Sequence, residues 1–84
     1  MPNNKNEYDA FNVALGLFLK KHRESNNMTI EELGKSIGRS KSWYYDIERG
    51  KNNIFHKDMI ALCKVLGCSI DDANEFINQY IDSL

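Results

Sequence analysis

Two helix start signals and two helix stop signals stand close together in residues 29–50, and this spacing restricts the fold more than any other feature of the chain. Thr29 and Glu32 have the capping-box spacing, in which each side chain bonds the backbone amide of the other residue. Gly38 can end that helix, Ser40 can cap a second one, and Gly50 can end it. The pattern predicts two short helices, the second over residues 41–48, joined by a turn of about three or four residues.

Apolar residues at helical spacing predict three further helices. The first covers residues 10–24 and has an apolar stripe made by Phe11, Leu15, Phe18 and Leu19. The fourth ends at Gly67, with an expected inward face of Met59, Ile60, Leu62, Cys63 and Leu66. The fifth lies within residues 69–84, where Ser69 can cap its start. The sequence therefore predicts an all-α fold of five helices, with a helix-turn-helix formed by the second and third.

Length and composition agree with one small domain over residues 1–84. The chain is 42% hydrophobic, which is enough for a modest core and argues against disorder. Residues 1–9 are expected to form a flexible N-terminus. No apolar run approaches the roughly 20 residues of a membrane span, and the N-terminus has no signal-peptide pattern. We therefore expect a cytoplasmic protein without a membrane partner.

The charges are unevenly distributed, although the net charge is only −1. Residues 35–57 contain six basic and two acidic residues, whereas residues 58–84 contain one basic and five acidic residues. A basic segment at the helix-turn-helix is consistent with a polyanionic partner, but ordinary scatter of surface charge explains the distribution equally well.

Three segments in register resemble the lambda-repressor/Cro-like helix-turn-helix family, also called the XRE family. They are residues 23–34 (RESNNMTIEELG), 40–50 (SKSWYYDIERG) and 62–72 (LCKVLGCSIDD). The resemblance covers residues 14–73 without an insertion. It implies a five-helix, lambda-repressor-like fold in which the helix at 41–48 reads double-stranded DNA.

The resemblance also implies roles for individual residues. The positions that read bases in the major groove correspond to Lys41, Ser42 and Asp46. The positions expected to contact the DNA backbone correspond to Thr29, Arg39, Trp43, Arg49, Lys51 and Asn52. For Trp43, bracing a dimer or filling a surface notch are open alternatives.

Other matched positions have structural roles in the family. Arg23 and Glu48 correspond to an ion pair that ties the recognition helix to the first helix. Tyr44 and Ile47 correspond to residues that pack this helix on the core, and Cys63 stands where a small buried residue is usual.

The chain departs from the family at several positions. Ile30 replaces a glutamine that often contacts phosphate, and an apolar side chain cannot make that bond. Asp46 brings a negative charge near DNA, so it must accept from a base or pair with a cation such as Lys41 or Arg49. Ile54 and Phe55 replace the usual residues before the fourth helix, which leaves its cap undefined.

No arrangement typical of an enzyme, metal centre or cofactor site is present in the sequence. Cys63 and Cys68 are not spaced like a zinc or redox pair, and His22 and His56 are isolated. We therefore expect no catalytic residues, no metal and no cofactor.

The leading interpretation is a sequence-specific DNA-binding transcriptional regulator, most simply a repressor, that acts as a homodimer. The predicted dimer interface is the apolar stripe of the last helix, Ile77, Tyr80, Ile81 and Leu84, which could instead pack on the first helix. The alternative is a protein-interaction module of the same fold, antitoxin-like or antirepressor-like, with weak DNA binding. Ile30, Asp46, the acidic last segment and the aromatic run Trp43, Tyr44 and Tyr45 favour that alternative, in which Trp43 and Tyr45 would bind a protein.

Overall fold

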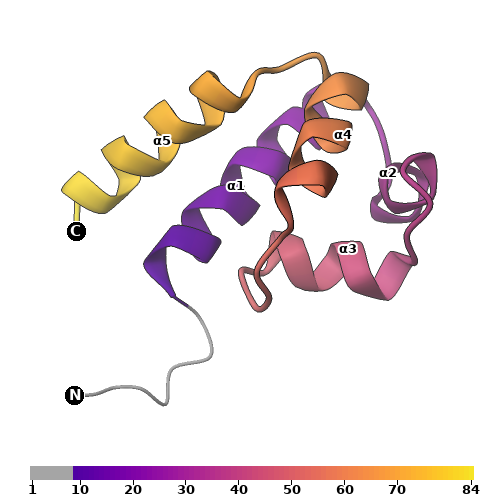
Figure 1. The fold of residues 1–84 in the computed structure, drawn as a ribbon, viewed down its shortest axis with the longest axis horizontal. Coiled ribbons are helices and arrows are strands. Elements are labelled where there is room, and N and C mark those ends of the chain that lie inside the picture. The colour runs from indigo at the N-terminus through magenta and orange to yellow at the C-terminus, as the bar shows by residue number, and fades with distance from the viewer. Residues whose placement is uncertain (1–8) are drawn as a thin grey trace.

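The computed structural model describes residues 9–84, which form five helices and no strand within that range. The helices are α1 (Ala10–Ser25), α2 (Ile30–Ser36), α3 (Lys41–Glu48), α4 (His56–Leu66) and α5 (Ile70–Asp82). In Figure 1, α5 lies along α1, while α2 and α3 lie together on the opposite side of the molecule. The predicted all-α, five-helix fold is confirmed.

Local hydrogen bonds set the helix ends, and the sequence predicts most of the residues that make them. Thr29 Oγ1 accepts from the Glu32 amide at 3.0 Å, and Glu32 Oε1 accepts from the Thr29 amide at 2.8 Å, which completes the capping box. Ser40 Oγ accepts from the Trp43 amide and caps α3, and Ser69 Oγ accepts from the Asp72 amide and caps α5. The start of α4 at Phe55 has no side-chain cap, as its sequence suggested.

α1 begins at Ala10, as predicted, and Asp9 directly precedes it. Asp9 caps this helix, because its carboxylate accepts from the amides of Phe11 and Asn12. Asp9 was assigned to a flexible segment, and the cap gives it a defined place instead. The rest of the predicted flexible N-terminus lies outside the described residues.

The core forms where α1, α2, α3, α4 and α5 meet. Its buried residues are Ala14, Leu15, Phe18, Leu19, Leu33, Tyr44, Ile47, Met59, Leu62, Cys63, Leu66, Ala73 and Ile77. Ile60 was predicted to face inward, but it is 38% exposed. The reason is angular, since residues 59, 62, 63 and 66 lie on one face of the helix and residue 60 lies about a quarter turn away.

The apolar stripe of α5 is divided between the core and the surface. Ile77 is buried in the core of its own chain, so its side chain is not available to a second subunit. Tyr80 is half-buried, Ile81 is 39% exposed and Leu84 is 77% exposed. Only the last turns of the predicted dimer interface therefore face solvent.

Two glycines allow α1 to approach the end of α3 closely. A Cβ atom at Gly16 would overlap the carbonyl oxygen of Glu48, and one at Gly50 would overlap the backbone of Val13. Gly50 also has a left-handed conformation, with φ +78°, in which other residues are strained. This crossing sets the position of α3 on the molecule.

None of the helices within residues 9–84 combines the length and the apolar character that a membrane crossing needs.

Candidate nucleic-acid interface

A nearly buried ion pair holds α3 against α1. Arg23 Nε donates to Glu48 Oε2 at 2.6 Å and Arg23 Nη2 donates to Glu48 Oε1 at 3.1 Å. The two side chains are only 11% and 6% exposed. Arg23 Nη1 also donates to the carbonyl oxygen of Met28, so the same guanidinium holds the segment before α2.

Tyr44 extends this network into the core. Its hydroxyl donates to Glu48 Oε2 at 2.6 Å, while its ring is fully buried. Burial, followed by the hydrogen bond to the Glu48 carboxylate, raises the pKa of Tyr44 far above its usual value. The hydrogen bond to Glu48 also raises the pKa of Arg23, so the guanidinium stays charged. Together these contacts orient α3 about its own axis.

That orientation exposes the first turn of α3 and the face that continues from it. Tyr44 and Ile47 point into the core, whereas Lys41, Ser42 and Tyr45 are exposed. Residues four apart on a helix lie above one another, so Lys41 and Tyr45 belong to one outward face. The structure thus places two of the three predicted base-reading residues, Lys41 and Ser42, next to each other in solvent.

The third, Asp46, lies beside this face and is half-buried. Its Oδ1 is 3.7 Å from Arg49 Nη1, and the Arg49 guanidinium lies over the ring of Tyr45 at 5.2 Å from the ring centre. Of the two cations that could balance Asp46, the structure therefore pairs it with Arg49.

Arg39, a predicted phosphate contact, is engaged within the protein. Its Nη2 donates to Asp58 Oδ2 at 2.6 Å, and its guanidinium lies over the Trp43 ring at 4.7 Å. Asp58 is itself buried, at 7% exposed. This contact links the turn before α3 to α4. Asp58 was not singled out from the sequence, because nothing local marks a pair between residues nineteen positions apart.

The start of α2 lies beside the start of α3. Thr29 and Lys41 line one shallow surface depression together with Arg23, Met28, Ile30 and Glu31. Glu31 adds a negative charge to this surface, partly balanced by Lys35 at 3.9 Å. Thr29 is exposed, and its hydroxyl caps α2.

The loop after α3 carries the last predicted backbone contacts. Lys51 and Asn52 are both exposed. The neighbouring Asn53 accepts a hydrogen bond from Asn12 Nδ2 at 2.7 Å, which fastens the loop to α1. Lys51 and Asn52 therefore project from a loop with a defined position.

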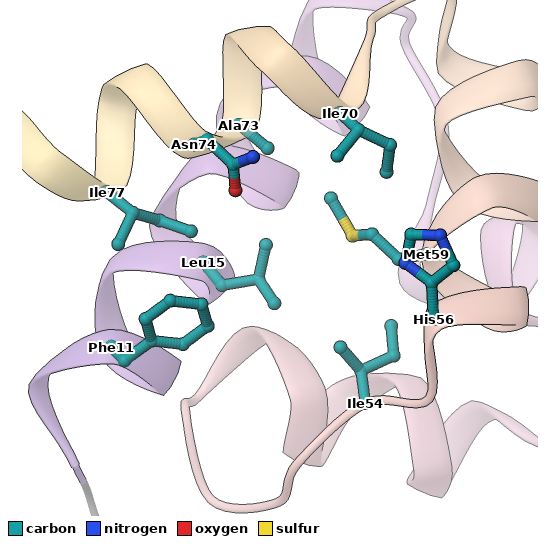
Figure 2. A pocket seen from close by; sticks show the side chains of 9 residues that line it. All are labelled: Phe11, Leu15, Ile54, His56, Met59, Ile70, Ala73, Asn74 and Ile77. Carbon is teal, nitrogen blue, oxygen red and sulfur yellow. The ribbon is translucent and has the colours of Figure 1, made fainter.

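A separate, mostly apolar groove is lined by residues outside α3 (Figure 2). It encloses about 180 Å³ between α1, α4, α5 and the loop before α4. Its lining residues are Phe11, Leu15, Ile54, His56, Met59, Ile70, Ala73, Asn74 and Ile77. Among residues 9–84, no group of three or more His, Cys, Asp or Glu side chains is placed to hold a metal ion.

Comparisons with solved structures agree with this architecture. Two crystal structures of the clp gene regulator ClgR from Corynebacterium glutamicum match with a TM-score of 0.78 and 24% sequence identity. The alignments cover 83% and 88% of this chain, and 90% and 78% of those chains. The restriction-modification controller protein C.Esp1396I matches with a TM-score of 0.74 and 23% identity, over 88% of this chain and 96% of that one. These likenesses establish the fold.

The sequence itself connects the chain to a family. No curated protein sequence matches it significantly. The family model of the helix-turn-helix domain, however, matches residues 14–76, which run from α1 into α5 and include the whole candidate interface. With the five-helix fold and the matching solved structures, this extended match shows that the chain belongs to the helix-turn-helix domain family.

Proposed function

We propose that this protein is a sequence-specific double-stranded DNA-binding regulator of transcription, which places α3 in the major groove. One observation carries the proposal. The first turn of α3 presents Lys41 and Ser42 to solvent, while Tyr44 and the ion pair of Arg23 and Glu48 fasten the opposite side of the helix. A helix held on one side and polar on the other suits the docking of a recognition helix.

The three base-reading candidates offer complementary chemistry. Lys41 can donate to the O6 and N7 atoms of guanine, and Ser42 can donate or accept. Asp46 can accept from the amino group of cytosine, although its contact with Arg49 competes with that role.

The phosphate contacts fall into two groups. Lys51 and Asn52 project from the loop, and Thr29 lies at the depression that it shares with Lys41. The second group comprises Arg39, Trp43 and Arg49, which already make contacts within the protein. Arg39 contacts Asp58 and the Trp43 ring, and Arg49 contacts Asp46, so these contacts must be kept or exchanged when DNA binds. We expect the first group to carry more of the salt-dependent affinity.

A homodimer would double the phosphate contacts of this small domain. Two recognition helices about 34 Å apart would enter successive major grooves of a palindromic or repeated DNA site. We propose that the protein acts in the cytoplasm. We propose Tyr80, Ile81 and Leu84 as interface residues, because they are the members of the α5 stripe that reach the surface. A bound operator that overlaps a promoter would make the protein a repressor.

The first test is fluorescence anisotropy with labelled mixed-sequence duplex DNA over a series of salt concentrations. We expect micromolar-range binding that weakens steeply with salt. Lys41→Ala should bind several-fold more weakly, whereas Lys64→Ala, which removes an exposed lysine in the last turn of α4, should bind like the wild type. Equal binding by the two variants would show that Lys41 on α3 does not contact DNA.

The alternative function is a protein-interaction module that retains the fold and has a weak DNA face. The negative charges of Glu31 and Asp46 next to the candidate interface favour it. A folded wild-type protein that binds no duplex even at low salt would support this alternative and refute the DNA-binding proposal.

Dimer formation is tested by sedimentation equilibrium of the wild type and Ile81→Asp. A charge at this exposed position of α5 should shift the protein to monomer without unfolding it. A monomeric wild type at the concentrations that bind DNA would refute the dimer.

A further inference from the structure

Tyr45 is an exposed aromatic residue in the middle of the outward face of α3. Its side chain is 46% exposed, whereas its neighbours Tyr44 and Ile47 are buried. It follows Lys41 by four residues and Ser42 by three, so it continues the face that these two begin. The family resemblance assigned no role to this position.

The ring of Tyr45 is held in place by a chain of contacts. The guanidinium of Arg49, one turn further along α3, lies over the ring at 5.2 Å from its centre. Arg49 is in turn 3.7 Å from the carboxylate of Asp46. A ring that is already oriented loses little conformational freedom when it meets a partner.

The major groove offers one apolar group to such a ring. Each base pair shows hydrogen-bond donors and acceptors there, but thymine also shows its C5 methyl group. We infer that Tyr45 is a specificity-determining residue, whose ring packs on the methyl group of a thymine in the recognised site. This inference rests on the proposed DNA-binding function and adds a base preference to it.

The geometry also predicts where that thymine lies. Four residues of α-helix span about 6 Å along the helix axis. Base pairs are stacked about 3.4 Å apart. If α3 lies along the groove, the thymine is therefore within about two base pairs of the base read by Lys41.

The experiment starts with duplexes selected by the wild-type protein from a randomised pool. In the selected duplex, each thymine is replaced in turn by uracil, which lacks only the C5 methyl group. Affinities are then measured by anisotropy for the wild type, Tyr45→Ala and Tyr45→Phe. Val65→Ala is the matched control, since Val65 is an exposed apolar residue in the last turn of α4. Figure 1 shows that this end of α4 points away from α3.

We expect uracil at one position to weaken wild-type binding about fourfold, which corresponds to about 0.8 kcal/mol for one buried carbon group. Tyr45→Ala should bind the thymine and uracil duplexes equally, while Tyr45→Phe and Val65→Ala should keep the fourfold preference. Binding preferences of Lys41→Ala should be relaxed at a base pair within about two of this thymine.

The failures of the two proposals are distinguishable. Sequence-selective binding with no sensitivity to uracil, or a preference that survives in Tyr45→Ala, would overturn the role of Tyr45 alone. Equal losses in Tyr45→Phe and Tyr45→Ala would overturn it as well, because the hydroxyl group and not the ring would then make the contact. No binding of the folded wild type to any duplex would refute the proposed function itself.

Discussion

Removal of the Glu48 carboxylate should be among the most damaging single changes to this fold. In Glu48→Ala, the guanidinium of Arg23 keeps its bond to the carbonyl of Met28 but loses both bonds to Glu48. The buried hydroxyl of Tyr44 loses its acceptor at the same time. A cation that is 11% exposed is thus left without a counter-charge.

The expected cost follows from that environment. Breaking a buried ion pair by removing one partner costs about 3–5 kcal/mol. For a domain whose total stability is about 5–15 kcal/mol, that is a large fraction. At about 4 °C or more per kcal/mol for a domain of this size, the melting temperature should fall by at least about 12 °C.

The assay is urea and thermal unfolding followed by far-UV circular dichroism. Glu31→Ala is the matched control, because Glu31 is 57% exposed and its contact with Lys35 is long, so its loss should cost less than about 1 kcal/mol. Replacing both partners with apolar residues, in Arg23→Met/Glu48→Leu, should be less damaging than Glu48→Ala. If Glu48→Ala were no less stable than Glu31→Ala, the ion pair would not be what holds α3 in place.

Three other predictions follow from the packing, the titration and the charge of named residues. Gly16→Ala should lower stability by about 1–3 kcal/mol in urea unfolding, because its Cβ would meet the rigid backbone of Glu48; a gain from the better helix propensity of alanine would contradict the close crossing. Burial raises the pKa of Cys63 from 9.0 to about 12, so the folded state holds a proton that the unfolded state releases, and stability should fall as the pH rises from about 9 towards 12. Cys63→Ala should show a smaller alkaline loss in unfolding curves measured from pH 7 to pH 11, and an unchanged loss would assign it to other groups. Asp46→Asn should strengthen binding to mixed-sequence duplex at low salt about two- to fivefold, since it removes a negative charge beside the interface; weaker anisotropy-measured binding would instead support a base contact by the carboxylate.

The sequence by itself determined where most helices begin and end. Thr29 with Glu32, Ser40 and Ser69 cap helices through bonds that span only three residues. Such contacts form within one turn of chain, so their spacing can be read without knowledge of the fold. The pairing of Arg23 with Glu48 was inferred differently, from the resemblance to a family in which the same positions pair.

Tertiary structure decided which side of each helix reaches the surface. Ile60 is exposed and Ile77 is buried, although both belong to apolar stripes of similar appearance in the sequence. An apolar helix face is covered only where another helix crosses it, and the crossing angles depend on packing between distant segments. The surface of the candidate interface, including the outward position of Tyr45, depends on the same packing.

Two other contacts that position α3 were not predicted from the sequence. In the sequence, Gly16 only lowers the helix propensity of α1. In the structure, the backbone of Glu48 lies so close that no larger residue fits there. Arg39 looks like an available cation until Asp58 is found beside it. Both contacts join residues far apart in the chain, and only the folded arrangement of α1, α3 and α4 brings their atoms within reach.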